Sequence, residues 1–162
     1  MNSSPWSKEG IMLSRRGFVA GVAGLFLAGR RTGWAAPGPT AITVYKSRSC
    51  GCCAKWVDHL TAQGFKPLVQ DEEDMDGLKD ELGVPKAVRS CHTAIAGAYL
   101  IEGHVPAADI RKALSDRPKA RGLAVPGMPA GTPGMAESEA AMGGFEVLAF
   151  QTDGSTRSFA RH

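Results

Sequence analysis

Three of the four cysteines in this chain of 162 residues lie within four positions, in the run Cys50-Gly51-Cys52-Cys53. Residues 41–46 are rich in β-branched side chains, which predicts a strand directly before this run. A helix is predicted over residues 50–64, because apolar side chains recur at helical spacing at Cys53, Trp56, Val57 and Leu60. The strand is therefore expected to deliver a cluster of thiols to the N-terminal end of a helix, where partial positive charge stabilises thiolates.

The remaining segments extend this strand–helix unit to a βαβαββα order. Strands are predicted at residues 65–70, 93–96 and 99–102, and helices at residues 74–82 and from Pro106 onward. Two further strands, 145–151 and 156–160, are predicted to form a hairpin across Asp153-Gly154. This order predicts an α/β, thioredoxin-like fold with an added C-terminal β-hairpin. Residues 118–144 are rich in Gly and Pro and have no period, which is typical of a functional or disordered loop.

The N-terminal segment has the layout of an export signal. Ser14-Arg15-Arg16-Gly17-Phe18-Val19 is a twin-arginine pattern, a short apolar stretch follows, and Gly33-Trp34-Ala35 offers small residues for cleavage after Ala35. We therefore predict a twin-arginine signal peptide at residues 1–35, a linker at 36–40 and a periplasmic domain at 41–162. An uncleaved N-terminal membrane anchor is disfavoured, because a membrane span needs about 20 apolar residues. No membrane attachment is expected after cleavage, and Met12 is an alternative start.

The distribution of charge excludes one class of partner. The whole chain has a formal net charge of +3, but the basic excess lies in the predicted signal peptide. Residues 36–162 hold 14 basic and 15 acidic side chains. A nucleic-acid partner is therefore not expected, because the domain lacks the required excess of positive charge.

A second group of metal-binding residue types lies at the start of the predicted third strand, in Ser90-Cys91-His92-Thr93-Ala94. In a thioredoxin-like fold this end of the strand faces the N-terminus of the first helix. Cys91 and His92 are therefore expected to close onto Cys50, Cys52 and Cys53. Two structural disulfides are a weaker explanation, because a bond between the adjacent Cys52 and Cys53 would be strained. The spacing of Cys50 and Cys53 is also that of a redox dithiol.

Further donor groups are available in two loops. Met128 and Met135 lie in the Gly/Pro-rich residues 125–135, where they either fill the core or place thioethers over the cysteines. His104 precedes a predicted helix, where it either binds a metal, caps the helix or contacts solvent. Thiolates and thioethers are soft donors that favour Cu(I), and closely spaced thiolates can bridge several copper ions. Zinc held by three Cys and one His is the alternative metal.

Several separated motifs resemble those of a known family. They are Cys50-Gly51-Cys52-Cys53 with Trp56, Gly83-Val84-Pro85, Ser90-Cys91-His92-Thr93-Ala94, Ile101-Glu102-Gly103-His104-Val105-Pro106-Ala107 and Gly122-Leu123-Ala124-Val125-Pro126-Gly127-Met128-Pro129. Over roughly residues 41–150 the chain resembles the CopG family of exported bacterial copper-resistance proteins, a metal-binding domain formerly of unknown function. The resemblance implies a thioredoxin-like fold, a cysteine-bridged copper site and a role in periplasmic copper handling, including interconversion of Cu(I) and Cu(II). The metal ligands that it implies are Cys50, Cys52, Cys53 and Cys91, with Met128, Met135, His92 and His104.

Two other functions are open alternatives. A thiol–disulfide oxidoreductase would use only Cys50 and Cys53, and a structural zinc module would recruit a partner. Thioredoxins place a proline directly before the third strand, whereas here Cys91-His92 occupies that stretch and the nearest proline is Pro85. This departure favours metal binding over dithiol exchange. The expected partners are copper ions and other periplasmic copper-handling proteins.

Overall fold

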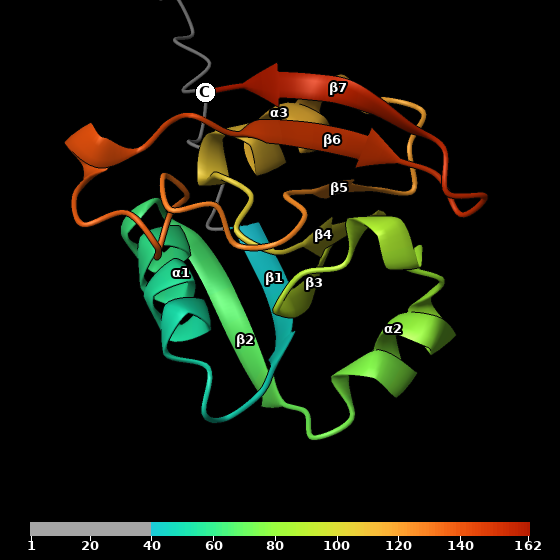
Figure 1. Cartoon of the computed structure of the whole chain (residues 1–162), viewed down its shortest axis with the longest axis horizontal. Coiled ribbons are helices and arrows are strands. Elements are labelled where there is room, and N and C mark those ends of the chain that lie inside the picture. The colour runs from blue at the N-terminus through green and yellow to red at the C-terminus, as the bar shows by residue number, and fades with distance from the viewer. Residues whose placement is uncertain (1–39) are drawn as a thin grey trace, which may run out of the picture. The chain divides into compact units, whose positions relative to one another are not determined.

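The computed structural model describes residues 40–162, which form seven strands and three α-helices (Figure 1). The strands are β1 (Thr40–Lys46), β2 (Phe65–Asp71), β3 (His92–Ala96), β4 (Tyr99–Glu102), β5 (Gly122–Ala124), β6 (Glu146–Phe150) and β7 (Thr156–Arg161). The helices are α1 (Gly51–Ala62), α2 (Met75–Leu82) and α3 (Ala107–Asp116), with short 3-10 turns at Lys86–Val88 and Glu139–Ala141. The order from β1 to α3 is the predicted βαβαββα, and β6 and β7 form the predicted hairpin.

All seven strands of the described region belong to one mixed sheet, in the order β2-β1-β3-β4-β5-β6-β7. The pairs β1–β2 and β4–β5 are parallel, and the other neighbouring pairs are antiparallel. In the register of β1 with β3, Lys46 lies opposite His92. Residues that follow β1 and residues that precede β3 therefore meet at the same edge of the sheet. The four cysteines lie in these two segments.

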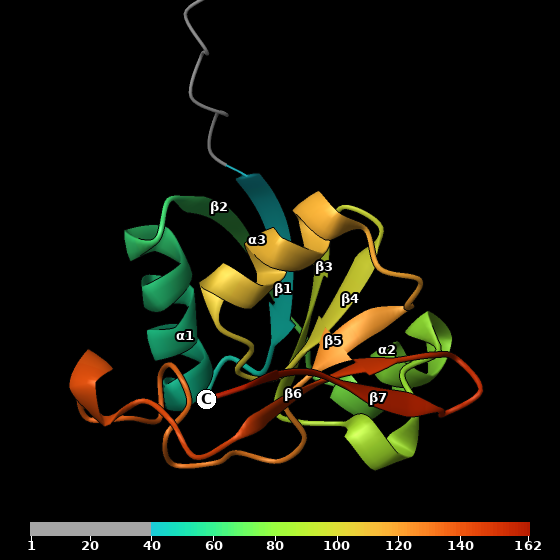
Figure 2. The same cartoon turned by 90° about the horizontal axis from the view of Figure 1, so that it is seen from above.

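Helices α1 and α2 cover opposite faces of the sheet (Figure 2). Successive residues of a strand point to opposite faces, and β3 illustrates the result. His92 packs against Trp56 of α1, whereas Thr93 accepts a hydrogen bond from Lys79 of α2. The predicted apolar face of α1 is confirmed, because Cys53, Trp56 and Leu60 are fully buried.

Helix α2 begins and ends close to its predicted bounds, for reasons that are local in sequence. The carboxylate of Asp74 accepts a hydrogen bond from the backbone N–H of Gly77 at 2.9 Å and caps the N-terminus. Gly83 ends the helix in the left-handed conformation, at φ 72°. Both signals are local, so the sequence alone locates this helix well.

Strand β5 corrects the prediction that residues 118–144 lack regular structure. Its three residues, Gly-Leu-Ala, are too few to show a period and include no β-branched side chain. The strand exists because β4 and β6 supply partners on both sides. A side chain at Gly122 would meet the carbonyl of Leu100 and the ring of Phe150, so close packing requires glycine at this position.

The predicted signal peptide and most of the predicted linker lie outside the described residues, and Thr40 is already the first residue of β1. Within residues 40–162, none of the helices combines the length and the apolar character that crossing a bilayer requires.

Candidate metal centre

The four cysteine sulfurs come together at the N-terminal end of α1. Cys50 and Cys53 form a disulfide, and Cys52 and Cys91 are free thiols. The Sγ atoms of Cys50 and Cys52 are 3.5 Å apart, and all four sulfurs lie within 4.8 Å of one another. Cys91 reaches the other three because it directly precedes β3, which pairs with the strand that leads into α1. The expected meeting of the four sulfurs is confirmed; their role as metal ligands stays a prediction.

Two imidazoles extend the cluster on the side of Cys91. The Sγ atom of Cys91 is 3.3 Å from Nδ1 of His92 and 3.1 Å from Nε2 of His104. These donor atoms of Cys91, His92 and His104 also lie within 4.8 Å of one another. Cys91 is therefore common to a group of four sulfurs and to a group of one sulfur and two nitrogens.

The orientation of His104 is fixed by a backbone carbonyl. Its Nδ1 atom donates a hydrogen bond to the carbonyl oxygen of Pro133 at 2.6 Å, since a carbonyl can only accept. The Nε2 lone pair consequently faces the sulfur of Cys91, as in metal sites where a second hydrogen bond selects the histidine tautomer. His104 is fully buried, so the alternative that it contacts solvent is wrong.

Burial disfavours the charged forms of Cys91, His92 and His104. Burial lowers the pKa of His92 well below its usual value, and the neighbouring His104 and Lys79 add to this effect. Burial also lowers the pKa of His104, although the hydrogen bond to Pro133 opposes the change. Burial, and to a lesser extent the neighbouring Cys52, raises the pKa of the Cys91 thiol to about 11. The imidazoles are therefore neutral, and a cation bound at Cys91 would displace the proton of its thiol.

A loop at residues 125–136, called the methionine loop below, covers the cluster. Met128 is 53% exposed, and its sulfur lies 4.0 Å from the Sγ atom of Cys52. Met135 is half-buried, and no equivalent sulfur contact joins it to a cysteine within residues 40–162. The structure therefore brings Met128 to the predicted site, whereas the role of Met135 rests on its position in the loop.

At Gly134 the backbone of the methionine loop packs closely against the first turns of α1. Its φ is 85°, and a Cβ atom there would lie 2.8 Å from both the carbonyl oxygen of Cys52 and the backbone nitrogen of Trp56. Only glycine allows this approach without displacing the loop. The adjacent carbonyl of Pro133 is the group that orients His104.

The substitution Gly134→Ala is expected to lower the free energy of unfolding by about 1–3 kcal/mol more than Gly144→Ala does, because it overpacks the contact with α1. Gly144 is the matched control, since its φ is 75° and a Cβ atom there would have no neighbour within 4 Å. Thermal unfolding of both variants measures the difference. Equal losses would show that the loop is not held by this approach.

Contacts between distant segments that the sequence did not reveal support the site. The rings of Trp56 and His92 have centroids 4.3 Å apart, and the indole N–H of Trp56 donates to the carbonyl of Val105 at 2.9 Å. His59 accepts a hydrogen bond from the backbone N–H of Ala107 at the start of α3. The first contact joins α1 to β3, and the other two join α1 to the residues that follow His104.

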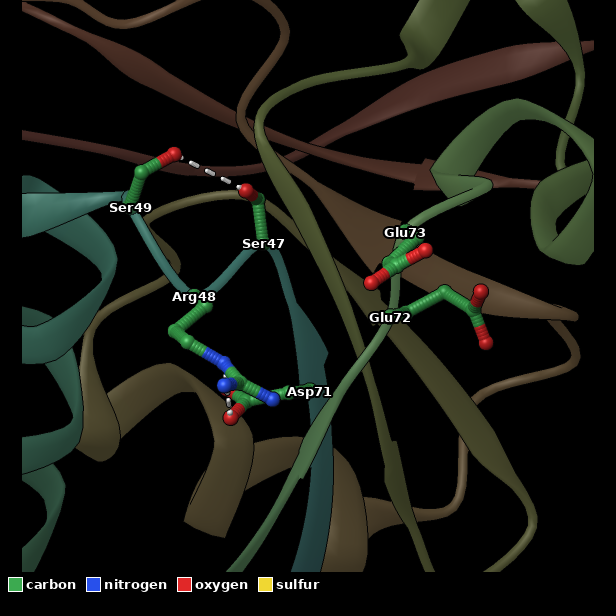
Figure 3. A pocket seen from close by; sticks show the side chains of 6 residues that line it. All are labelled: Ser47, Arg48, Ser49, Asp71, Glu72 and Glu73. Carbon is green, nitrogen blue, oxygen red and sulfur yellow. Dashed lines mark hydrogen bonds and ion pairs between the residues drawn. The ribbon is translucent and has the colours of Figure 1, made fainter.

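A cavity of about 700 Å³ lies beside the loop that leads to Cys50, but its lining has different chemistry (Figure 3). The side chain of Arg48 pairs with Asp71 at 3.2 Å, and the hydroxyls of Ser47 and Ser49 are 3.1 Å apart. Glu72 and Glu73 complete the lining, which contains neither a thiol nor an imidazole. This cavity is therefore distinct from the cysteine cluster.

Comparison with solved structures identifies the family. Two structures, named copper resistance protein CopG form 1 and form 2, each share 43% sequence identity with this chain. Each match covers 76% of this chain and 98% of the other, with TM-scores of 0.69 and 0.70 respectively. The chain belongs to the CopG family. The resemblance predicted from the sequence motifs is thereby confirmed.

A model of a protein family of unknown function, DUF411, matches residues 88–135. No curated protein sequence matches the chain. The matched segment holds Cys91, His92, His104, Met128 and Met135, so it contains every predicted CopG ligand outside the Cys50–Cys53 run.

Proposed function

We propose that this protein acts in copper resistance by binding copper at the cysteine cluster and by coupling the Cys50–Cys53 dithiol to interconversion of Cu(II) and Cu(I). The observation that carries the proposal is the meeting of four sulfurs within 4.8 Å, two of which form a disulfide. Copper is a substrate in this reaction. The names of the two CopG structures support copper as the metal.

The donor set favours the monovalent ion. Thiolate sulfur is soft and suits Cu(I), and one thiolate can bridge two ions when several sulfurs lie this close. His92 and His104 supply neutral nitrogen donors next to Cys91. Zinc accepts the same donors, but the exposed thioether of Met128 beside Cys52 favours copper. Met128 is also placed where a copper-handling partner could exchange the ion.

The redox step balances within the chain. Two Cu(II) ions accept one electron each as the thiols of Cys50 and Cys53 lose two protons and form their disulfide. The products are two Cu(I) ions, which the remaining thiolates of Cys52 and Cys91 and the imidazoles can hold. In the reverse direction, two Cu(I) ions give one electron each to the disulfide, which takes up two protons and returns to two thiols. A single conversion in either direction therefore needs no further oxidant or reductant.

The proposed fold and location agree with this role. The order β2-β1-β3-β4, with β1 parallel to β2, supports a thioredoxin-like domain that places Cys50 and Cys53 at the start of α1. The twin-arginine pattern at Arg15 and Arg16 supports export to the periplasm before the signal peptide is removed. The oxidising periplasm permits the disulfide state.

The test mixes anaerobically reduced protein with Cu(II). We expect one Cu(I) ion to form for each thiol lost, as measured by a chromophoric Cu(I) chelator and by thiol titration. Mass spectrometry should locate the first disulfide at Cys50 and Cys53. In the variant Cys50→Ser this bond cannot form, so Cu(I) should appear much more slowly.

Two results would count against the proposal. Copper that stays divalent while all thiols remain titratable would remove the redox step. A reduced protein that takes up no Cu(I) would remove the copper site as well. Metal analysis after removal of loosely bound ions distinguishes the two cases.

A second function, thiol–disulfide exchange with other proteins, is favoured by one observation, the Cys50–Cys53 disulfide at the N-terminus of α1. This activity needs neither Cys91 nor copper. Copper-free protein should then reduce insulin disulfides, and Cys91→Ser should do so equally well.

A further inference from the structure

A buried ion pair lies on the face of the sheet opposite the cysteine cluster. Lys79 of α2 pairs with Glu102 of β4, and the Lys79 ammonium also donates to the hydroxyl of Thr93 at 3.0 Å. The Thr93 hydroxyl in turn donates to Glu102 Oε2 at 2.6 Å. All three residues are at most 2% exposed. The proposed copper chemistry uses none of these groups directly.

The pair is connected to the site through Ser90. The backbone N–H of Ser90 donates to Glu102 Oε1 at 2.6 Å, which fixes the residue that precedes Cys91. The Ser90 hydroxyl donates to the carbonyl of Gly127, the residue that precedes Met128. One carboxylate is therefore linked, through one serine, to the backbone on which Cys91 and Met128 are carried.

The backbone of β4 reinforces the same junction. The carbonyl of Glu102 accepts from the N–H of Val125 at 3.0 Å, and the N–H of Gly103 donates to the carbonyl of His92 at 3.0 Å. A Cβ atom at Gly103 would lie 2.6 Å from Ser90 and 2.7 Å from the carbonyl of Val125. The segments around Ser90, Gly103 and Val125 are thus closely packed against one another. A displacement of Glu102 would therefore also displace Cys91, His104 and the methionine loop.

Stability alone does not explain a buried ion pair at this position. Well-packed apolar residues of similar volume often replace such a pair without loss of stability, because the cost of desolvating two charges disappears. What apolar residues cannot supply is a strong acceptor for the N–H of Ser90. The network therefore holds the backbone of Ser90 in a position that apolar packing alone would not fix.

We propose that Glu102, held in place by Lys79 and Thr93, is a positioning residue for the copper site that sets the placement of Cys91 and Met128 through Ser90. This inference rests on the proposed copper function. Glu102 does not touch the metal. It acts by fixing the sulfurs of Cys91 and Met128 beside that of Cys52.

The test compares two double variants that both remove the charges. Lys79→Met with Glu102→Leu removes the acceptor for Ser90, whereas Lys79→Met with Glu102→Gln keeps an amide oxygen at the same place. Neither variant leaves a charge buried without its partner. The first should bind Cu(I) about 10- to 100-fold more weakly, as expected when the support of a ligand is lost. The second should recover most of the affinity.

Spectroscopy separates positioning from general damage. The copper–sulfur distances measured by X-ray absorption, and the thiolate charge-transfer bands, should change in the leucine variant and return in the glutamine variant. Lys112→Met with Asp116→Leu removes an exposed ion pair of α3 and is the control. All variants should show cooperative thermal unfolding.

Three outcomes would count against the positioning role of Glu102. If the wild-type protein binds no copper, the proposed function fails and this inference fails with it. If the wild type binds copper and the leucine variant has the same affinity and spectrum, only the positioning role is overturned. Equal weakening of both double variants would assign the effect to charge rather than to the Ser90 hydrogen bond and would also overturn the inference.

Discussion

Replacing Cys91 with serine is expected to lower the affinity for Cu(I) by more than about 100-fold, which exceeds the loss typical of removing only the support of a ligand. The sulfur of Cys91 is the one atom common to both donor groups, within 4.8 Å of the three other sulfurs and of the two imidazoles. A hydroxyl of nearly the same size is a hard donor that does not compensate for the lost thiolate. Competition with a chromophoric Cu(I) chelator, under anaerobic reducing conditions, measures the affinity.

The pH dependence of the affinity gives an independent check on the same variant. The pKa of Cys91 is raised to about 11, so below that pH the binding of copper must displace its proton. Each displaced proton makes the affinity rise about tenfold per pH unit, and this contribution continues until the pH reaches the raised pKa. The Cys91→Ser variant should therefore show a slope that is shallower by one proton than the slope of the wild type.

Every cysteine of the chain belongs to the cluster, so the control for Cys91→Ser is the folding of the variant itself. Thermal unfolding should change little, because the substitution is close to isosteric and the residue is only half-buried. An unchanged affinity and an unchanged pH slope would contradict the shared role of Cys91. If the variant also kept disulfide-exchange activity, the dithiol function would become the better description.

The sequence predicted the elements whose signals are local. The apolar face of α1, the Asp74 cap and Gly83 stop of α2, and the β3–β4 hairpin need no distant partner to be recognised. Strand β5 was not predicted, because it forms only by pairing with β4 on one side and β6 on the other. A run of three residues has no period to detect, whatever its role in the sheet.

The same distinction applies to the candidate site. Cys50, Cys52, Cys53 and Cys91 were predictable because thiols at these spacings are unusual and the strand order brings them together. The supporting residues were not, because nothing local marks them. Lys79 lies in a short acidic helix of ordinary surface composition, yet it is buried against Glu102. Pro133 orients His104 only because the methionine loop folds back across α1.

We expect the side chain of Trp56 to contribute both to the stability of the domain and to the geometry of the site. It is fully buried on α1, its ring packs on His92, and its N–H reaches the carbonyl of Val105 beside His104. The substitution Trp56→Ala should lower the free energy of unfolding by about 3–5 kcal/mol. Because domains are stable by about 5–15 kcal/mol, enough folded protein should remain in the cold to measure copper binding. We expect that binding of Cu(I) also weakens, by about 10-fold or more, since His92 loses the ring that packs on it and the segment that carries His104 loses its hydrogen bond to the indole.

The matched control is Leu60→Ala, one helical turn farther along the same buried face. It should cost about 2–5 kcal/mol of stability and yet keep the wild-type affinity for Cu(I), because Leu60 lies one turn farther than Trp56 from the N-terminal end of α1, where the sulfurs meet. Unfolding by denaturant and chelator competition at low temperature measure the two quantities separately. If both variants lose stability and copper affinity in the same proportion, Trp56 matters only as core packing. If only Trp56→Ala loses affinity, the indole orients the ligands, because the two helix positions are otherwise equally buried.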